Sequence, residues 1–403
     1  MKITIAGAGI AGLATALALD ADGHDIEIFE AVQEIKPLGV GINLLPHAAA
    51  ILNGLGVLDD LLKSGVATSE LSYFNRHGQK IWSEPRGLYA GQNAPQVSLA
   101  RGELQRILLL HVRERLGESR IHSGHRLVSF SNKKDLAVAI FSTPSSPELI
   151  VQSDILICAD GIHSAARAQL YPDEGAPLYS GRLLWRATTM APPFLSGTSM
   201  IMAGHEDQKF VCYPIESCGE DGLQKINWIA ELRRPLLRNP EDWNRKGDIN
   251  DFYDEFVDWN FDWLDVPSLI TGAEQIYEYP MVDRTPVNSW TEKRVTLLGD
   301  SAHPMYPIGS NGASQAILDA ADLSEALREV ADPEEALLAY ENCRLPKTSS
   351  IVFANRGNGP EQCMQLAEER APNGFAKLED VFLPGELRAI ADRYKVVTGL
   401  KRN

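Results

Sequence analysis

Three glycines near the N-terminus have the spacing Gly7-x-Gly9-x-x-Gly12. The residues from Lys2 to Ala6 read as a buried strand, and apolar positions recur at helical spacing after Gly12. In this context Gly7 permits a tight turn, Gly9 lets the backbone approach a pyrophosphate, and Gly12 lets helix and strand pack closely. The free N–H groups at the helix start would then face phosphate charge. The pattern predicts a dinucleotide-binding turn.

An acidic residue completes this fingerprint. The segment Asp25 to Phe29 reads as a second strand, and Glu30 stands at its end, about 20 residues beyond the glycines. Its carboxylate would accept hydrogen bonds from the hydroxyls of an adenosine ribose. FAD and NAD both use this arrangement, so the motif alone leaves the choice of dinucleotide open.

Two further apolar strands end in an acid and a glycine. The segment 154–159 leads to Asp160-Gly161, and 294–298 leads to Gly299-Asp300. A loop rich in Pro and Gly then reaches Gly312, where a helical pattern starts. Asp300 could simply cap a turn, but it could also accept a hydrogen bond from a polyol, while the helix start stabilises negative charge. A flavin supplies both groups, and three such strand ends in one chain favour a large, extended cofactor.

These motifs resemble those of the FAD-dependent aromatic hydroxylases, the single-component flavin monooxygenases typified by p-hydroxybenzoate and salicylate hydroxylase. The resemblance covers about residues 1 to 350 and contains all three motifs in the family's order. Longer strings look most like the phenazine hydroxylase branch of that family. They are residues 37–43, 82–87, 279–284 and 305–319.

The resemblance also implies a set of FAD-binding residues. Arg101 and Gln105 lie four apart on one helix face and match a pair that approaches the FAD phosphates, although Arg101 could also be an ordinary exposed charge. Leu127 matches a strand position whose backbone holds the adenine, and Val40 and Gly41 match a loop beside the isoalloxazine. The full expected set is Gly7, Gly9, Ala11, Gly12, Glu30, Ala31, Val40, Gly41, Arg101, Gln105, Leu127, Asp160, Gly299, Asp300, Gly309, Asn311, Gly312 and Ala313.

The middle of the chain, from about 170 to 280, has short β-like runs rich in aromatic and β-branched residues. They predict a separate sheet, which in the family forms the substrate pocket. Arg186 could meet a substrate carboxylate or form a structural salt bridge, and each aromatic candidate could equally be a core residue. The pocket candidates are Arg186, Tyr213, His47, Trp185, Tyr73 and Tyr306. We interpret His303 as structural, and no side chain is assigned as a general base.

The expected fold is mixed α/β, with a Rossmann-like FAD-binding domain, an interleaved β-sheet substrate domain and C-terminal helices. We expect the FAD-binding domain at 1–65, 98–170 and 281–330, the substrate domain at 66–97 and 171–280, and the helical segment at 331–403. The sequence does not decide whether the tail beyond 357 packs.

The resemblance implies an FAD-dependent monooxygenase that hydroxylates a small aromatic or N-heteroaromatic compound. NADH or NADPH would reduce the flavin transiently, and O₂ would form a C4a-hydroperoxide that transfers oxygen to the ring. Two alternatives stay open: a flavin-dependent reductase or oxidase of the same fold, and an NAD-dependent dehydrogenase. The dehydrogenase would not explain the motifs at Asp160 and Asp300.

Composition narrows the classes of partner. The 403 residues include 54 acidic and 38 basic side chains, a net charge of −16, which disfavours nucleic-acid binding. The five cysteines show no metal-binding spacing, so we expect no metal and a cytoplasmic protein with reduced thiols. No apolar run is long enough to span a membrane, and hydrolase and kinase motifs are lacking. A monomer or a homodimer is compatible with the sequence.

Overall fold

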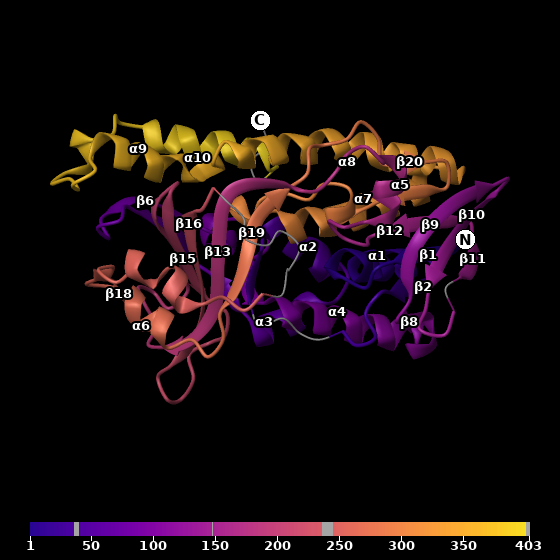
Figure 1. The fold of residues 1–403 in the computed structure, drawn as a ribbon, viewed down its shortest axis with the longest axis horizontal. Coiled ribbons are helices and arrows are strands. Elements are labelled where there is room, and N and C mark those ends of the chain that lie inside the picture. The colour runs from indigo at the N-terminus through magenta and orange to yellow at the C-terminus, as the bar shows by residue number, and fades with distance from the viewer. Residues whose placement is uncertain (36–39, 147, 236–244, 400–403) are drawn as a thin grey trace.

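The computed structural model describes residues 1–35, 40–146, 148–235 and 245–399. Figure 1 shows two sheet-based halves side by side, with helices from the C-terminal third running along one edge of both. The fold is mixed α/β, as the sequence predicts. Residues 37–39 of the phenazine-hydroxylase-like string, 236–244 of the expected substrate domain and the last four residues lie outside the described ranges.

The first half is built on a mainly parallel sheet. Its strands β1 and β2 match the two expected near the N-terminus, and β1 pairs in parallel with both β2 and β12. Ile3 and Ile5 are fully buried, because helices α1, α4 and α7 and the three-stranded β9–β11 sheet both pack against this sheet. In spatial order the strands are β20 (Thr291–Glu292), β21 (Val295–Leu297), β12 (Ile155–Cys158), β1 (Lys2–Ala6), β2 (Asp25–Glu30) and β8 (Ile121–Ser123).

Helices α1, α4 and α7 pack together beside this sheet. Leu13 and Leu17 of α1 and Leu323 of α7 are fully buried in the same core. The helices are α1 (Ile10–Ala21), α2 (Pro46–Gly54), α3 (Leu58–Ser64), α4 (Arg101–Leu116), α5 (Ala165–Leu170), α6 (Val266–Thr271), α7 (Gly312–Glu329), α8 (Pro333–Arg356), α9 (Gln362–Arg370) and α10 (Glu386–Val397).

The second half is a seven-stranded, mostly antiparallel sheet. One face packs on an aromatic core that includes Trp185, Trp228 and Phe252, and the alternate residues face the first half of the molecule. Its order is β19 (Tyr277–Asp283), β13 (Leu178–Ala191), β16 (Gln224–Arg233), β15 (Gln208–Pro214), β14 (Ser199–His205), β5 (Glu70–Phe74) and β6 (Lys80–Pro85). Strand β19 crosses position 281, where the sequence places a domain boundary.

Three smaller sheets complete the described strands. One contains β4, from the segment expected in the substrate domain, and joins it to β3 and β7 beside the large sheet. The small sheets are β3 (Gly41–Leu44), β7 (Gln96–Ala100) and β4 (Val66–Thr68); β11 (Leu149–Ser153), β10 (Leu136–Ser142) and β9 (Arg126–Lys133); and β17 (Asn260–Phe261) with β18 (Leu264–Asp265).

The C-terminal segment packs as helices. Asp332 caps α8 by accepting hydrogen bonds from two backbone N–H groups, as its position before Pro333 predicts. Met364 of α9 and Leu387 of α10 are buried against the seven-stranded sheet. Within the described ranges, none of the helices combines the length and apolar character needed to cross a bilayer.

Candidate active site

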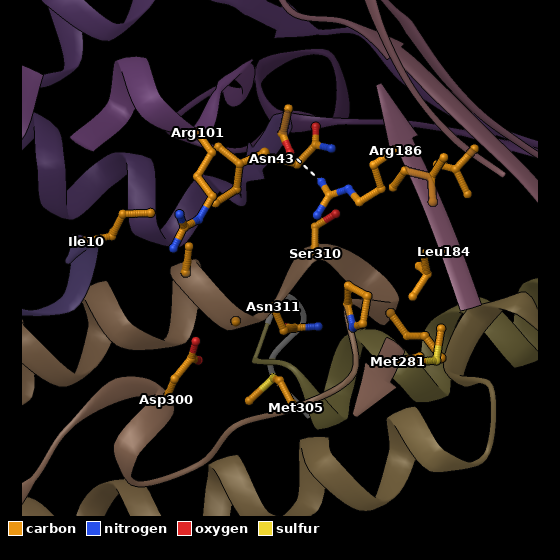
Figure 2. A pocket seen from close by; sticks show the side chains of 18 of the residues that line it. Ile10, Asn43, Arg101, Leu184, Arg186, Met281, Asp300, Met305, Ser310 and Asn311 are labelled. Atoms are coloured by element: carbon orange, nitrogen blue, oxygen red, sulfur yellow. Dashed lines mark hydrogen bonds between the residues drawn. The ribbon is translucent and has the colours of Figure 1, made fainter. Parts of the chain in front are cut away.

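A cavity of about 320 Å³ lies between the two halves (Figure 2). On one side its wall contains Gly9, Ala159 and Asp300, which lie within three residues of the ends of β1, β12 and β21. The carboxyl ends of parallel strands are where open α/β sheets bind ligands. On the other side the wall is the face of the seven-stranded sheet. The cavity therefore joins the expected cofactor motifs to the expected substrate sheet.

Two helix N-termini open onto this cavity. Helix α1 starts after Gly9 and α7 starts at Gly312, and among the described residues no side chain caps either helix. A Cβ atom built on Gly9 or Gly312 would meet no described atom within 4 Å. Both helix starts thus present free N–H groups to open space, which suits an anion.

The other two glycines of the fingerprint are fixed by packing. Gly7 has φ +109°, and a Cβ there would lie 2.3 Å from the carbonyl oxygen of Ala159. A Cβ on Gly12 would lie 1.9 Å from the carbonyl oxygen of Gly7. Only glycine fits at these two positions, so the turn is held close to the strand ends.

Arg101 and Asp300 supply opposite charges to the cavity wall, and Figure 2 shows them pointing into it from opposite sides. Burial lowers the pKa of Arg101, while the charge of Asp300 raises it. Among the described residues, no carboxylate forms an ion pair with the Arg101 guanidinium. Asp300 is exposed. Arg101 and Asp300 therefore offer a cation and a hydrogen-bond acceptor to a ligand in the cavity.

A buried network positions Asp300. The backbone N–H of Gly299 donates to Asp319 Oδ2 at 3.0 Å, His303 Nε2 lies 2.6 Å from the same oxygen, and Arg344 Nε donates to Oδ1 at 2.8 Å. Burial alone would raise the pKa of Asp319, but His303 and Arg344 lower it to about 2. His303 is buried within this network, which agrees with a structural role.

Gly41 connects the two walls. Its N–H donates to Asn227 Oδ1 at 2.6 Å, and its carbonyl accepts from Arg186 Nη2 at 2.8 Å. A Cβ on Gly41 would lie 2.7 Å from Asn227 Cβ, so only glycine allows this approach. The substrate sheet therefore fixes the start of β3 directly.

The cavity face of the large sheet is a regular grid of side chains. Arg186, Ile229, Val211 and Met202 lie in one row, because 186 pairs with 229, 229 with 211, and 211 with 202. The next row, about 7 Å along the strands, contains Leu184, Glu231 and Lys209. Together with Met281, these residues form a mostly apolar surface with a few placed charges.

Of the expected residues, the cavity brings together Gly9, Ala11, Gly41, Arg101, Asp300, Asn311, Gly312, Ala313, Arg186 and Tyr213. Others lie behind its wall and support it. Gln105 donates to the carbonyl of Ala8 at 2.9 Å, and Glu30 accepts from the N–H groups of Ala8 and Val32. The remainder of the expected cofactor set also lies outside the lining that the described residues define: Gly7, Gly12, Ala31, Val40, Leu127, Asp160, Gly299 and Gly309.

Four expected pocket residues do not line the cavity. Trp185 alternates with Leu184 and Arg186, so its ring faces the other side of the sheet and stacks on Phe252. The structure places the three others away from the lining: Tyr73 is buried on β5, Tyr306 packs against Leu184 and Met281, and His47 lies on α2. Burial lowers the pKa of His47 to about 4.

The family model described as the FAD binding domain matches residues 1–354. The chain belongs to this FAD-binding family. It is 41 % identical to phenazine 1,6-dicarboxylic acid hydroxylase of Lysobacter antibioticus, over 98 % of each protein. It is 29 % identical to 3-amino-4-hydroxybenzoate 2-monooxygenase PtmB3 of Streptomyces platensis, over 94 % of each.

Solved structures agree on the fold. The crystal structure of Klebsiella pneumoniae HpxO complexed with FAD and uric acid superposes with a TM-score of 0.78 at 23 % identity, covering 100 % of this chain and 98 % of that one. The chain is an FAD-dependent aromatic monooxygenase, as the resemblance implies, and NAD(P)H is the reductant typical of the family. The relatives do not favour the reductase or the dehydrogenase.

The residues present fit FAD. Open helix starts at Gly9 and Gly312 and the free guanidinium of Arg101 would hold its negatively charged groups. Asp300 would accept from its hydroxyls. Asp160 Oδ1 is also buried without a hydrogen-bond partner among the described residues, although Asp160 lies outside the lining. When bound, the flavin takes hydride from the nicotinamide and activates O₂.

Sequence reasoning missed the residues that the sheet contributes by register. Lys209, Glu231, Asn227 and Leu184 line or support the cavity although none belongs to a motif. A signal was present, because charged residues on a strand whose alternate positions are apolar mark a face with special contacts. Glu361 was also missed; it belongs to the tail whose packing the sequence leaves open.

Proposed function

We propose that this monooxygenase hydroxylates a fused N-heteroaromatic carboxylate of the phenazine type. The observation that supports this proposal is Arg186, a cation beside the apolar side chains of the cavity wall, whose Nε is buried without a hydrogen-bond partner among the described residues. A planar guanidinium with a free donor suits a carboxylate. The relative that is 41 % identical over its whole length carries a phenazine dicarboxylic acid in its name.

The residues around Arg186 would orient such a substrate. Leu184, Met202 and Ile229 form a flat apolar surface on which a fused ring can stack and from which water is excluded. Burial raises the pKa of Tyr213 to about 12 despite the opposing effect of Arg186. The Tyr213 hydroxyl therefore stays protonated at neutral pH and can donate a hydrogen bond.

The domain limits and the individual FAD contacts expected from the sequence stay part of this proposal. The pairing of β3 with β7 and the contacts of Gly41 support a cofactor domain held against the substrate sheet. All five cysteines are free thiols, which supports a reducing, cytoplasmic compartment.

Substrate-stimulated oxidation of NADH and NADPH tests the proposal. We expect phenazine-1-carboxylate to stimulate oxidation strongly and unsubstituted phenazine to do so at least tenfold less, because only the carboxylate can pair with Arg186. Arg186→Met should abolish that difference, while the exposed Arg233→Met should preserve it. Equal stimulation by both compounds in the wild type would contradict the assigned role, and FAD content shows whether either variant has disturbed the cofactor.

A further inference from the structure

Three charged side chains meet in the second row of the cavity face. Lys209 of β15 and Glu231 of β16 are directly paired across the sheet, and Glu361, just before α9, reaches them from the C-terminal segment. We call these three residues the Lys209 cluster. All three line the cavity, and each is less than a tenth exposed. The cluster lies one row further from Gly41 than Arg186 does.

The cluster shares one ammonium between two carboxylates. Lys209 Nζ lies 2.8 Å from Glu231 Oε2 and 2.5 Å from Glu361 Oε2. Two further charged groups lie next to the cluster. Arg182 Nε of β13 lies 3.7 Å from Glu231 Oε1, and Arg182 Nη2 lies 3.6 Å from Glu206 Oε2. The three cluster residues, which are nearly dry, carry one net negative charge when all are ionised, and that is costly. The more exposed pair of Arg182 and Glu206 adds no net charge.

One acceptor of the cluster is left over. Glu231 Oε1 is buried and accepts no hydrogen bond from any described residue, since Arg182 Nε is too distant for one. A buried carboxylate oxygen without a donor indicates that a partner is supplied from elsewhere. Glu231 lines the cavity, so a small rotation of its buried carboxylate would bring Oε1 to a ligand there.

We propose that the Lys209 cluster is a second recognition point for the substrate, which accepts a hydrogen bond from a ring hydroxyl or N–H and rejects a second carboxylate, so that the substrate of this chain differs from the dicarboxylic acid in the name of the 41 % identical relative. This inference rests on the proposed function, in which Arg186 takes the first carboxylate. A donor would satisfy Glu231 Oε1, whereas another anion would bring a third carboxylate to one ammonium. Arg186 would then bind a carboxylate, and the Lys209 cluster in the adjacent row would bind a hydrogen-bond donor of the same substrate.

The titration behaviour of the cluster agrees with this assignment. Burial raises the pKa of Glu361, Lys209 lowers it, and Glu231 raises it again, with a net increase. Burial lowers the pKa of Lys209, but Glu231 and Glu361 more than offset that, so the ammonium stays charged. The site already carries more negative charge than it can accommodate easily.

Binding of three related probes to the FAD-loaded enzyme tests the inference. The probes are phenazine-1-carboxylate, 6-hydroxyphenazine-1-carboxylate and phenazine-1,6-dicarboxylate, and dissociation constants are measured from the change in flavin absorbance. We expect the hydroxy compound to bind at least tenfold more tightly than the dicarboxylate, with the monocarboxylate between them. This ranking needs no variant. Equal affinities, or a preference for the dicarboxylate, would overturn the inference but not the proposed function; failure of all three to bind would overturn both.

Glu231→Gln refines the test. We expect it to reduce the preference for hydroxyl over carboxylate at least fivefold. The matched control is Glu216→Gln, which removes a carboxylate from the exposed pair with Lys225 on the same sheet. An unchanged ranking in Glu231→Gln, with normal FAD content and melting temperature, would show that the cluster is structural only.

Discussion

The two ends of the cavity recognise their ligands in different ways. At the cofactor end, the groups that we propose for recognition are backbone N–H groups at two helix starts, glycines that allow close approach, and Arg101 and Asp300. At the substrate end, they are side chains from three strands placed by register, such as Arg186, Lys209 and Glu231. Backbone recognition requires particular residue types at a fixed spacing, whereas side-chain recognition across strands leaves no local pattern.

The fingerprint glycines offer the strongest way to test this distinction. Gly9→Val places a side chain in the open cavity with an ordinary φ of −72°, so the apoprotein should melt within about 2 °C of the wild type while FAD binds at least a hundredfold more weakly. Gly12→Val should instead destabilise the apoprotein strongly, because its Cβ meets the Gly7 carbonyl. FAD titration and thermal melting of both apoproteins measure the difference. Wild-type FAD affinity in Gly9→Val would show that Gly9 does not face the cofactor.

The Asp319 network should affect stability in a pH-dependent way. Asp319→Asn leaves Arg344 buried without its full counter-charge, and we expect a loss of about 3 kcal/mol in the free energy of unfolding near neutral pH. The native pKa of about 2 lies below that of an aspartate in the unfolded chain, so this stabilisation is present above about pH 4 and is lost as the pH falls towards 2.

Urea unfolding at several pH values measures that effect. Between pH 5 and pH 3 the wild type should lose more stability than Asp319→Asn does. Parallel pH profiles for the two proteins would mean that the ionised carboxylate of Asp319 contributes little.

The cofactor end was largely predictable from the sequence, and the substrate end was not. Gly9, Arg101, Asp300 and Gly312 line the cavity because each follows a strand or opens a helix, and such positions can be read from local patterns. Trp185 shows the limit: the sequence marks it as a strand residue, but only the register reveals that Leu184 and Arg186 face the cavity instead. The sequence could not predict that Glu361 lines the cavity, because its position depends on how the C-terminal helices pack.

Filling the substrate end should leave the cofactor end intact. Ile229 lies in the middle of the apolar row beside Arg186, so Ile229→Trp should reduce substrate-stimulated NAD(P)H oxidation at least tenfold. Its FAD affinity should stay within about twofold of the wild type, because FAD would bind at the two helix starts and this row of the sheet contains neither of them. Steady-state oxidation and FAD titration separate the two effects. Equal losses in both would mean that the ends are not independent.

The smallest expected effect concerns the loop before α7. The hydroxyl of Tyr394 accepts from Asn311 Nδ2 at 2.9 Å and lies 2.7 Å from Asn355 Oδ1. Tyr394→Phe should lower the free energy of unfolding by about 1 kcal/mol and weaken FAD binding a few fold, because the loop that leads to Gly312 loses a support. Tyr89→Phe, at an exposed tyrosine, is the control. Identical denaturation curves and FAD affinities for the two variants would show that the Tyr394 hydroxyl does not support this loop.

Together, the two ends of the cavity should transfer oxygen to an aromatic ring. Turnover of phenazine-1-carboxylate with NADH or NADPH under ¹⁸O₂, followed by mass spectrometry of the product, tests this most directly. We predict a hydroxylated product that contains one ¹⁸O atom, with one nicotinamide oxidised for each product formed. Nicotinamide oxidation that yields only hydrogen peroxide and unchanged phenazine-1-carboxylate would contradict the account.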